Sequence, residues 1–146
     1  MDVAVRPATP EDDLRVATLA ADAIAEQVEG RGGHVWSQRE ALRAPGDSGE
    51  TFVGTIDEVV VGFASVDVEV LADGSPLGVV TSIYVDPGAR EVAIGEALID
   101  EVIAWCTERD CIGIDSHALP GNRQTKNFFE TFGFTARLLV VHRSLR

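Results

Sequence analysis

Arg90, Ala93 and Gly95 belong to a stretch whose residue types suit the binding of an anion. Small side chains at positions 93 and 95 let a ligand approach the backbone, and the first N–H groups of a helix have no partner inside that helix. The helix dipole adds partial positive charge at the same end. This combination is the usual protein arrangement for binding a phosphate or a pyrophosphate.

A strand before this stretch and a helix after it must hold these residues in place. Apolar residues alternate from Val79 to Val85, which predicts a strand. Asp86-Pro87-Gly88 ends it, because proline cannot donate to a ladder and glycine permits a tight turn. From Arg90 to Cys106 the apolar residues recur at three- and four-residue steps, which predicts a helix with small residues in its first turn.

Two groups of residues resemble one known family. Arg90-x-x-Ala93-x-Gly95, after a strand that ends in Val85-Asp86-Pro87, resembles the acyl-CoA-binding motif of the GNAT superfamily of N-acyltransferases. Asn122, Phe128-Phe129 and Gly133-Phe134 resemble its closing segment, in the same order and at the same spacing. The resemblance covers nearly the whole chain and implies one GNAT-like domain over residues 1–146, with acetyl-CoA as the acyl donor and no metal.

The resemblance also implies where acyl-CoA binds. The pyrophosphate is expected at the helix start, and a backbone N–H near the end of the central strand is expected to stabilise the oxyanion of the thioester. Phe128, Phe129, Phe132 and Phe134 are expected mostly in the core, and Phe129 is also a candidate to pack against the pantetheine arm. The expected cofactor contacts are Ile83, Tyr84, Val85, Arg90, Glu91, Val92, Ala93, Ile94, Gly95, Glu96, Asn122 and Phe129.

Two proton-handling groups of the family are missing from this sequence. Phe129 stands where the family often carries a tyrosine, and Val79 falls near the position of a carboxylate found in some members. The remaining catalytic candidates are His117, Tyr84 and Ser82. His117 has the side chain suited to a base near neutral pH, but a histidine that bonds a carbonyl at a strand end is the alternative. For Tyr84, the sequence favours a packed sheet residue over a catalytic role.

Two functions therefore follow from the sequence. The first is an N-acyltransferase, expected to be an acetyltransferase, that moves an acyl group from acyl-CoA to a primary amine of a small molecule or a protein. The second is a degenerate GNAT domain that binds acyl-CoA or a protein partner without turnover. The missing tyrosine and carboxylate favour the second function, whereas Arg90, Gly95 and Asn122 favour the first. His34 and Trp36 either line an acceptor pocket or belong to a loop held by a buried tryptophan.

Composition narrows the class of partner. A net charge of −12 opposes binding to nucleic acid phosphates and is compatible with a cationic substrate. No apolar run approaches the ~20 residues of a membrane span, and the N-terminus has no signal region. Cys106 and Cys111 are expected to be buried thiols in a reducing cytoplasm. The partners expected are an amine substrate, no nucleic acid and no membrane, with a possible homodimer.

The order of the predicted elements indicates an α/β fold. A helix is expected from Thr9 to Gly30, with an apolar stripe at Leu14, Ala17, Ala21, Ile24 and Val28. Short helices are expected from Ser37 to Leu42 and from Asn122 to Thr131. Further strands are predicted at Val3–Arg6, Thr51–Ile56, Val59–Leu71, Ile112–Ala118 and Ala136–Arg143. The result is a mixed sheet of about six to seven strands with about four helices, in which the resemblance implies that two neighbouring strands splay around the thioester.

Overall fold

Five strands form one mixed sheet in the order β1-β2-β3-β4-β5 in the computed structural model of the chain, which describes residues 1–30, 32–39, 49–90, 92–118 and 123–146. The strands are β1 (Val3–Pro7), β2 (Glu50–Ile56), β3 (Val59–Val70), β4 (Pro76–Val85) and β5 (Ile114–Asp115). The helices are α1 (Asp13–Val28), α2 (Gly33–Arg39), α3 (Ile94–Glu108) and α4 (Arg123–Thr131), with 3-10 turns η1 (Pro10–Asp12) and η2 (Pro87–Ala89). Neighbouring strands are antiparallel except β4 and β5, which are parallel.

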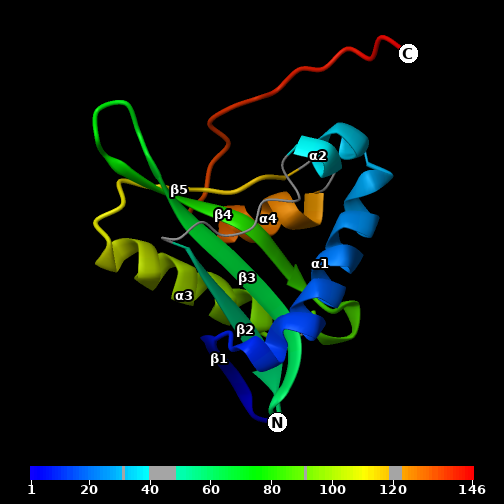
Figure 1. Cartoon of the computed structure of the whole chain (residues 1–146), viewed down its shortest axis with the longest axis vertical. Helices are drawn as coiled ribbons and strands as arrows, with labels where there is room; N and C mark the ends of the chain where they lie inside the picture. The colour runs from blue at the N-terminus through cyan, green and yellow to red at the C-terminus, as the bar shows by residue number, and fades with distance from the viewer. Residues whose placement is uncertain (31, 40–48, 91, 119–122) are drawn as a thin grey trace.

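The alternation of side chains along the strands separates two cores. Phe52 and Val80 face the larger core, which contains the inner face of α3 and Phe129 of α4. Val53 and Phe63 face the opposite side, where they pack against Leu19 of α1. Helix α1 therefore covers one face of the sheet and α3 covers the other, as Figure 1 shows.

Glycines let α3 lie very close to the sheet. A Cβ atom at Gly54 of β2 would fall 2.6 Å from the Ile94 side chain, and one at Gly78 of β4 would fall 2.5 Å from the Cys106 sulfur. These distances are shorter than two packed carbon or sulfur atoms allow, so both positions require glycine. The two ends of α3 are thereby placed against β2 and β4.

The turns that connect the central strands follow their sequence signals. Asp57 and Glu58 both have positive φ in the tight turn between β2 and β3, as expected from their position. Asp86 ends β4 as predicted, and its carboxylate accepts a hydrogen bond from the Gly88 N–H at 2.9 Å. Arg15 of α1 donates to the Val60 carbonyl at 3.1 Å and also contacts Asp86, which links α1 to the end of β4.

The predicted apolar stripe of the first helix was wrong. Leu14 is 85% exposed, whereas Leu19 is fully buried and Val16 and Ala20 pack beside it. Helix α1 is rich in alanine, so its apolar residues satisfy the helical period on more than one face, and contact with the sheet decides between them.

Several predicted element boundaries also differ from the structure. The strand predicted at Ile112–Ala118 is only Ile114–Asp115, because β5 pairs with β4 through two residues and then diverges from it. The strand predicted at Ala136–Arg143 is not formed, since no strand in the described chain pairs with these residues. The second difference leaves the sheet with five strands in the described chain, where the sequence predicted six or seven. Helix α2 begins before the predicted Ser37, and Leu42 and Asn122 lie outside the described residues.

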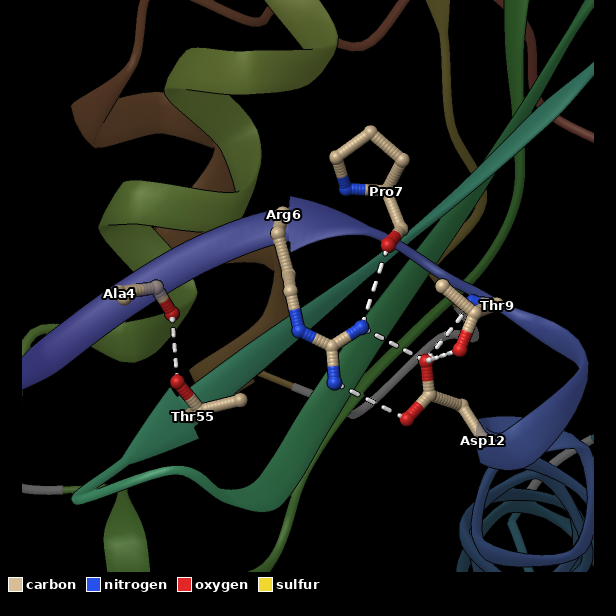
Figure 2. A network of polar contacts seen from close by, with 6 residues as sticks. All are labelled: Ala4, Arg6, Pro7, Thr9, Asp12 and Thr55. Carbon is tan, nitrogen blue, oxygen red and sulfur yellow. Dashed lines mark hydrogen bonds and ion pairs between the residues drawn. The ribbon is translucent and has the colours of Figure 1, made fainter.

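The start of α1 is fixed to the first strand by a buried carboxylate. Asp12 accepts two hydrogen bonds from the Arg6 guanidinium, at 2.7 and 3.1 Å, and one from the Thr9 N–H at 2.8 Å (Figure 2). The hydrogen bonds from Arg6, followed by that from Thr9, lower the pKa of Asp12 to about 2. Proline at the first position of η1 completes the helix start that the sequence predicted.

Replacing this carboxylate should weaken the fold in a pH-dependent manner. We expect Asp12→Asn to lower the free energy of unfolding at pH 7 by about 1–3 kcal/mol, because charge-assisted hydrogen bonds are lost. Glu11→Gln, a change of an exposed carboxylate in the same turn, should have an effect below about 0.5 kcal/mol. The folded-state pKa of Asp12 is about 2, below the unfolded value of about 3.9. Its contribution is therefore complete above the unfolded value and is lost as the pH falls toward 2. Urea unfolding of both variants between pH 7 and pH 2 measures this, and a difference that does not shrink in acid would contradict it.

Candidate active site

A cavity of about 420 Å³ opens where β4 and the chain after β5 separate. β5 pairs with β4 only at Gly78 and Val79 in the described chain, and beyond this point the two segments diverge. One wall is β4 from Val80 to Val85, and the other is the segment 116–118. Helices α1, α2 and α4, Arg90 and the start of α3 at Gly95 complete the lining, and Trp36 of α2 is part of it.

Most residues predicted from the sequence line this one cavity. Those in its lining are Ser82, Ile83, Tyr84, Val85, Arg90, Gly95, His117 and Phe129. Val92, Ala93 and Glu96 lie beside it at the start of α3 but do not line it, and Ile94 points into the core with no exposed surface. Glu91 and Asn122 lie outside the described residues. The structure therefore brings the predicted catalytic and cofactor-binding residues to the same place in the fold.

The start of α3 borders the cavity through Gly95. A Cβ atom at this position would lie 3.1 Å from the Phe128 ring of α4 and 3.8 Å from a methyl group of Val85. The absence of a side chain therefore serves packing against α4 as well as access to the backbone. Because α3 extends over 15 residues, its dipole directs partial positive charge toward this border.

The end of β4 offers a backbone donor to the cavity. The Asp86 N–H donates to the Val61 carbonyl of β3 at 2.8 Å. Because successive N–H groups of an extended strand point to opposite edges, the Val85 N–H points away from β3. That is the edge along which β4 has separated from β5 and lines the cavity.

Glu26 is a site residue that the sequence analysis missed. Its carboxylate accepts a hydrogen bond from the Tyr84 hydroxyl and another, at 2.8 Å, from the Arg90 guanidinium. Arg90 also donates to the Val85 carbonyl at 2.9 Å, and its guanidinium carbon lies 5.0 Å from the centre of the Tyr84 ring. A usable signal existed, since Glu26 lies seven residues after Leu19 and therefore on the sheet-facing side of α1.

The contacts of Glu26 set the protonation of two groups. Partial burial raises the pKa of Glu26, but the hydrogen bonds from Arg90 and Tyr84 outweigh it, so the pKa lies below its ordinary value and the group is a carboxylate at neutral pH. Burial, and then the hydrogen bond to Glu26 and its charge, raise the pKa of Tyr84 to about 12. The pair therefore consists of a stable carboxylate and a phenol that keeps its proton.

Phe129, which stands where the GNAT closing segment often carries a tyrosine, is almost fully buried. Its ring centre lies 5.4 Å from that of Phe128 and 5.1 Å from that of Phe134. The side chain supplies an apolar wall to the cavity and holds α4 against the core, and it offers no proton.

The family model described as Acetyltransferase (GNAT) family matches residues 15–134. The chain thus belongs to the GNAT family of acetyltransferases. It is 28% identical over 112 residues to an aminoglycoside N(6')-acetyltransferase type 1 of Salmonella typhimurium, with 74% of this chain and 76% of the relative covered. The same enzyme type of Salmonella enteritidis matches equally.

Solved structures share the fold over the full chain. AAC(6')-Iy in complex with the bisubstrate analogue CoA-S-monomethyl-acetylneamine has a TM-score of 0.75 and 22% identity, and the match covers 100% of this chain and 99% of that one. An acetyltransferase of Trypanosoma brucei has a TM-score of 0.72 and 19% identity, and the match covers 99% of this chain and 100% of that one.

None of the helices in the described part of this chain is long and apolar enough to cross a bilayer.

The chain's single tyrosine makes the contact with Glu26 directly measurable. We expect Glu26→Gln to lower the pKa of Tyr84 from about 12 toward the ordinary phenol value of about 10. The reason is that a neutral amide does not oppose the phenolate charge. Phenolate absorbance after stopped-flow jumps to alkaline pH, recorded before unfolding, gives the value. Glu29→Gln, an exposed change just after α1, should leave it unchanged. Equal pKa values for Tyr84 in the wild type and in Glu26→Gln would show that the pair is not formed in solution.

Proposed function

We propose that this protein is an acyl-CoA-dependent N-acyltransferase that transfers an acyl group, preferably acetyl, to a primary amine. The observation that carries the proposal is the opening of the sheet beside β4, bordered by the start of α3 and by the Val85 N–H. This opening gives a thioester space next to a backbone donor, while the pyrophosphate is directed to a helix start. Membership of the GNAT family supports the same placement.

Acyl-CoA fits the groups that border the cavity. The first turn of α3 offers backbone N–H groups and the positive end of a dipole, and Gly95 leaves that backbone accessible. Arg90 offers a guanidinium, which forms strong hydrogen bonds with phosphate oxygens. Phe129 and Val80 offer apolar surface for a pantetheine arm. Arg90 is bound to Glu26 in this structure, so a pyrophosphate must compete with that carboxylate.

Glu26 suits the recognition of the acceptor amine. Among the described residues that line the cavity it carries the only carboxylate, and its charge is retained at neutral pH. A primary amine arrives as an ammonium ion, which a carboxylate attracts. Arg90 leaves Glu26 when it turns to a pyrophosphate, and this exposes the carboxylate to the ammonium group. The aminoglycoside acetyltransferases among the relatives support a cationic small-molecule acceptor.

His117 is the group proposed to take the proton from the bound amine. It lines the cavity on the wall opposite β4, and histidine is the side-chain type that accepts protons near neutral pH. Glu26 is too weak a base for this task because its pKa is lowered. Ser82 lines the same wall as Tyr84 and can hold a water between the amine and His117.

The leaving thiolate is proposed to depart without a strong acid from the protein. Tyr84, with a pKa of about 12, is a much weaker acid than a thiol of about 8.5. Proton transfer from its hydroxyl to the thiolate is therefore uphill. Its proposed role is to orient Glu26, while positioning and the Val85 N–H supply the acceleration.

The burial of Phe129 in place of a hydroxyl favours the second candidate, a domain that binds acyl-CoA without turnover. Thiol release from acetyl-CoA with a panel of amines, an aminoglycoside among them, distinguishes the two.

A charged side chain at the start of α3 should abolish CoA binding. We expect Gly95→Glu to lose measurable affinity for CoA in calorimetry, because its carboxylate repels the pyrophosphate and blocks the backbone. Gly95→Ala is the matched control, since its Cβ makes the same 3.1 Å approach to Phe128 without a charge. It should retain CoA binding, and its melting temperature reports the cost of that contact. Equal affinity of wild type and Gly95→Glu would exclude this helix start as the pyrophosphate site.

Substitutions of Glu26 and of His117 should change different kinetic constants of the reaction with the amine. We expect Glu26→Gln to raise KM for the amine roughly 10- to 100-fold with little change in kcat, because an ionic contact with the ammonium is lost. Its CoA affinity should stay equal or rise, since Arg90 is released. His117→Ala should lower kcat by about 10²–10⁴-fold and remove the rise of activity with pH on the acidic side of the profile, because a base is lost there by protonation.

Asp22→Asn is the control for the loss of one negative charge from α1, because Asp22 lies one turn before Glu26 and does not line the cavity. It should leave KM and kcat unchanged. Steady-state kinetics against pH measures all three variants. A Glu26→Gln enzyme with unchanged KM, or a His117→Ala enzyme with unchanged kcat and pH profile, would remove the corresponding role.

A further inference from the structure

Cys106 and Cys111 stand on either side of the turn that ends α3, and they are the only cysteines of the chain. The Cys111 N–H donates to the Cys106 carbonyl at 3.1 Å, and the Asp110 N–H donates to the Thr107 carbonyl at 3.1 Å. Asp110 has a positive φ of 57°. These features define a Schellman helix end, in which residues five positions apart bring their side chains into contact. The backbone therefore holds the two thiols together.

The two thiols differ in their access to solvent. Cys106 is 2% exposed, whereas Cys111 is half-buried, although the sequence predicted that both are buried. Burial, followed by the charge and the hydrogen bond of Cys111, raises the pKa of Cys106 to about 12. Cys106 therefore keeps its proton, and a reagent from solvent reaches Cys111 first.

Arg109 places a positive charge beside this pair. Its guanidinium donates to the Trp105 carbonyl at 3.0 Å, and its central carbon lies 3.8 Å from the centre of the Trp105 ring. The charge of Arg109 acts to lower the pKa of Cys106, against the larger effect of burial. A cation next to a partly exposed thiol favours the thiolate, which is the reactive form. It also offsets the negative end of the α3 dipole.

The pair adjoins the short contact between β4 and β5. A Cβ atom at Gly78 would fall 2.5 Å from the Cys106 sulfur, so this sulfur packs directly on β4. The Gly78 N–H donates to the Gly113 carbonyl at 2.9 Å. The chain that follows Cys111 therefore runs against β4 before it diverges and forms one wall of the cavity.

We propose that Cys106 and Cys111 form a dithiol site that a hydroperoxide converts into a reversible disulfide. The Cys111 thiolate attacks one oxygen of the hydroperoxide, the O–O bond breaks, and the other oxygen takes up a proton and leaves as an alcohol or as water. Cys111 is then a sulfenic acid. The Cys106 sulfur attacks the Cys111 sulfur, an S–S bond forms and the S–O bond breaks. The hydroxide that leaves takes the Cys106 proton and becomes water.

The disulfide joins the last turn of α3 to the segment that leads through β5 into the cavity wall. The hydroperoxide takes up both electrons that the two thiols lose, so no further oxidant is required. This inference does not depend on the proposed acyl transfer, because it needs only the two sulfurs and the oxidant.

Peptide mapping of the full chain tests the proposal. After treatment with hydrogen peroxide, the wild type should be lighter by the mass of two hydrogen atoms and should take up no alkylating reagent when unfolded. Trypsin cuts after Arg109, between the two cysteines, so the disulfide should join the peptides 91–109 and 110–123. A non-reducing gel should show the 15.6 kDa monomer, and dithiothreitol should restore both thiols.

Two single variants separate the roles of the cysteines. Cys106→Ser should stop at the sulfenic acid of Cys111, which dimedone traps. Cys111→Ser should lose the Cys106 thiol at least about tenfold more slowly than the wild type does, because the Cys106 sulfur is buried. Cys111→Ser changes a half-buried residue, and circular dichroism checks its fold, so this comparison decides even where Cys106→Ser does not fold.

Four results would overturn the proposal. The first is oxidation of Cys111 to the sulfinic acid in the wild type while Cys106 stays reduced. The second is a disulfide that links two chains. The third is an equal rate of loss of the Cys106 thiol in the wild type and in Cys111→Ser. The fourth is a wild type that keeps both thiols in peroxide.

Discussion

The close packing of α3 against the sheet is the constraint on which the remaining structure depends. Ile94 and Cys106, near the two ends of the helix, contact strand positions where only glycine leaves enough space. These contacts hold the first turn of α3 beside the end of β4. The end of β4 and the start of α3 therefore lie together, and Val85 and Gly95 both border the same cavity. Because the chain belongs to the GNAT family, these neighbouring elements are the proposed acyl-CoA site.

The cavity exists because β4 loses its neighbour. β5 is held against β4 through two residues only, and the space beyond them is closed by α1, α2 and α4. Opening a sheet leaves backbone donors without ladder partners, which is costly unless a ligand or solvent uses them. A thioester carbonyl next to the Val85 N–H is a use that fits this arrangement.

Charge in the site is arranged around one carboxylate. Glu26 holds the Tyr84 hydroxyl and the Arg90 guanidinium, so the residue expected to bind a pyrophosphate is engaged before any ligand arrives. Binding of acyl-CoA and release of Glu26 are linked through Arg90 in the proposed reaction.

The sequence by itself determined the parts of this protein that rest on local rules. Pro87 and Gly88 ended the central strand, and the small residues at 93 and 95 marked the start of α3. The pattern from Val79 to Cys106 assigned a strand and a helix correctly in type, although β4 already begins at Pro76 and α3 begins at Ile94 instead of Arg90. Tertiary structure alone decided what rests on contacts between distant elements. It selected Leu19 instead of Leu14 as the buried side of α1, and so brought Glu26 to Tyr84, 58 positions later in the chain. It also left residues 136–143 unpaired, because a strand exists only where another strand receives its hydrogen bonds, and periodicity within one segment does not say whether that partner is present.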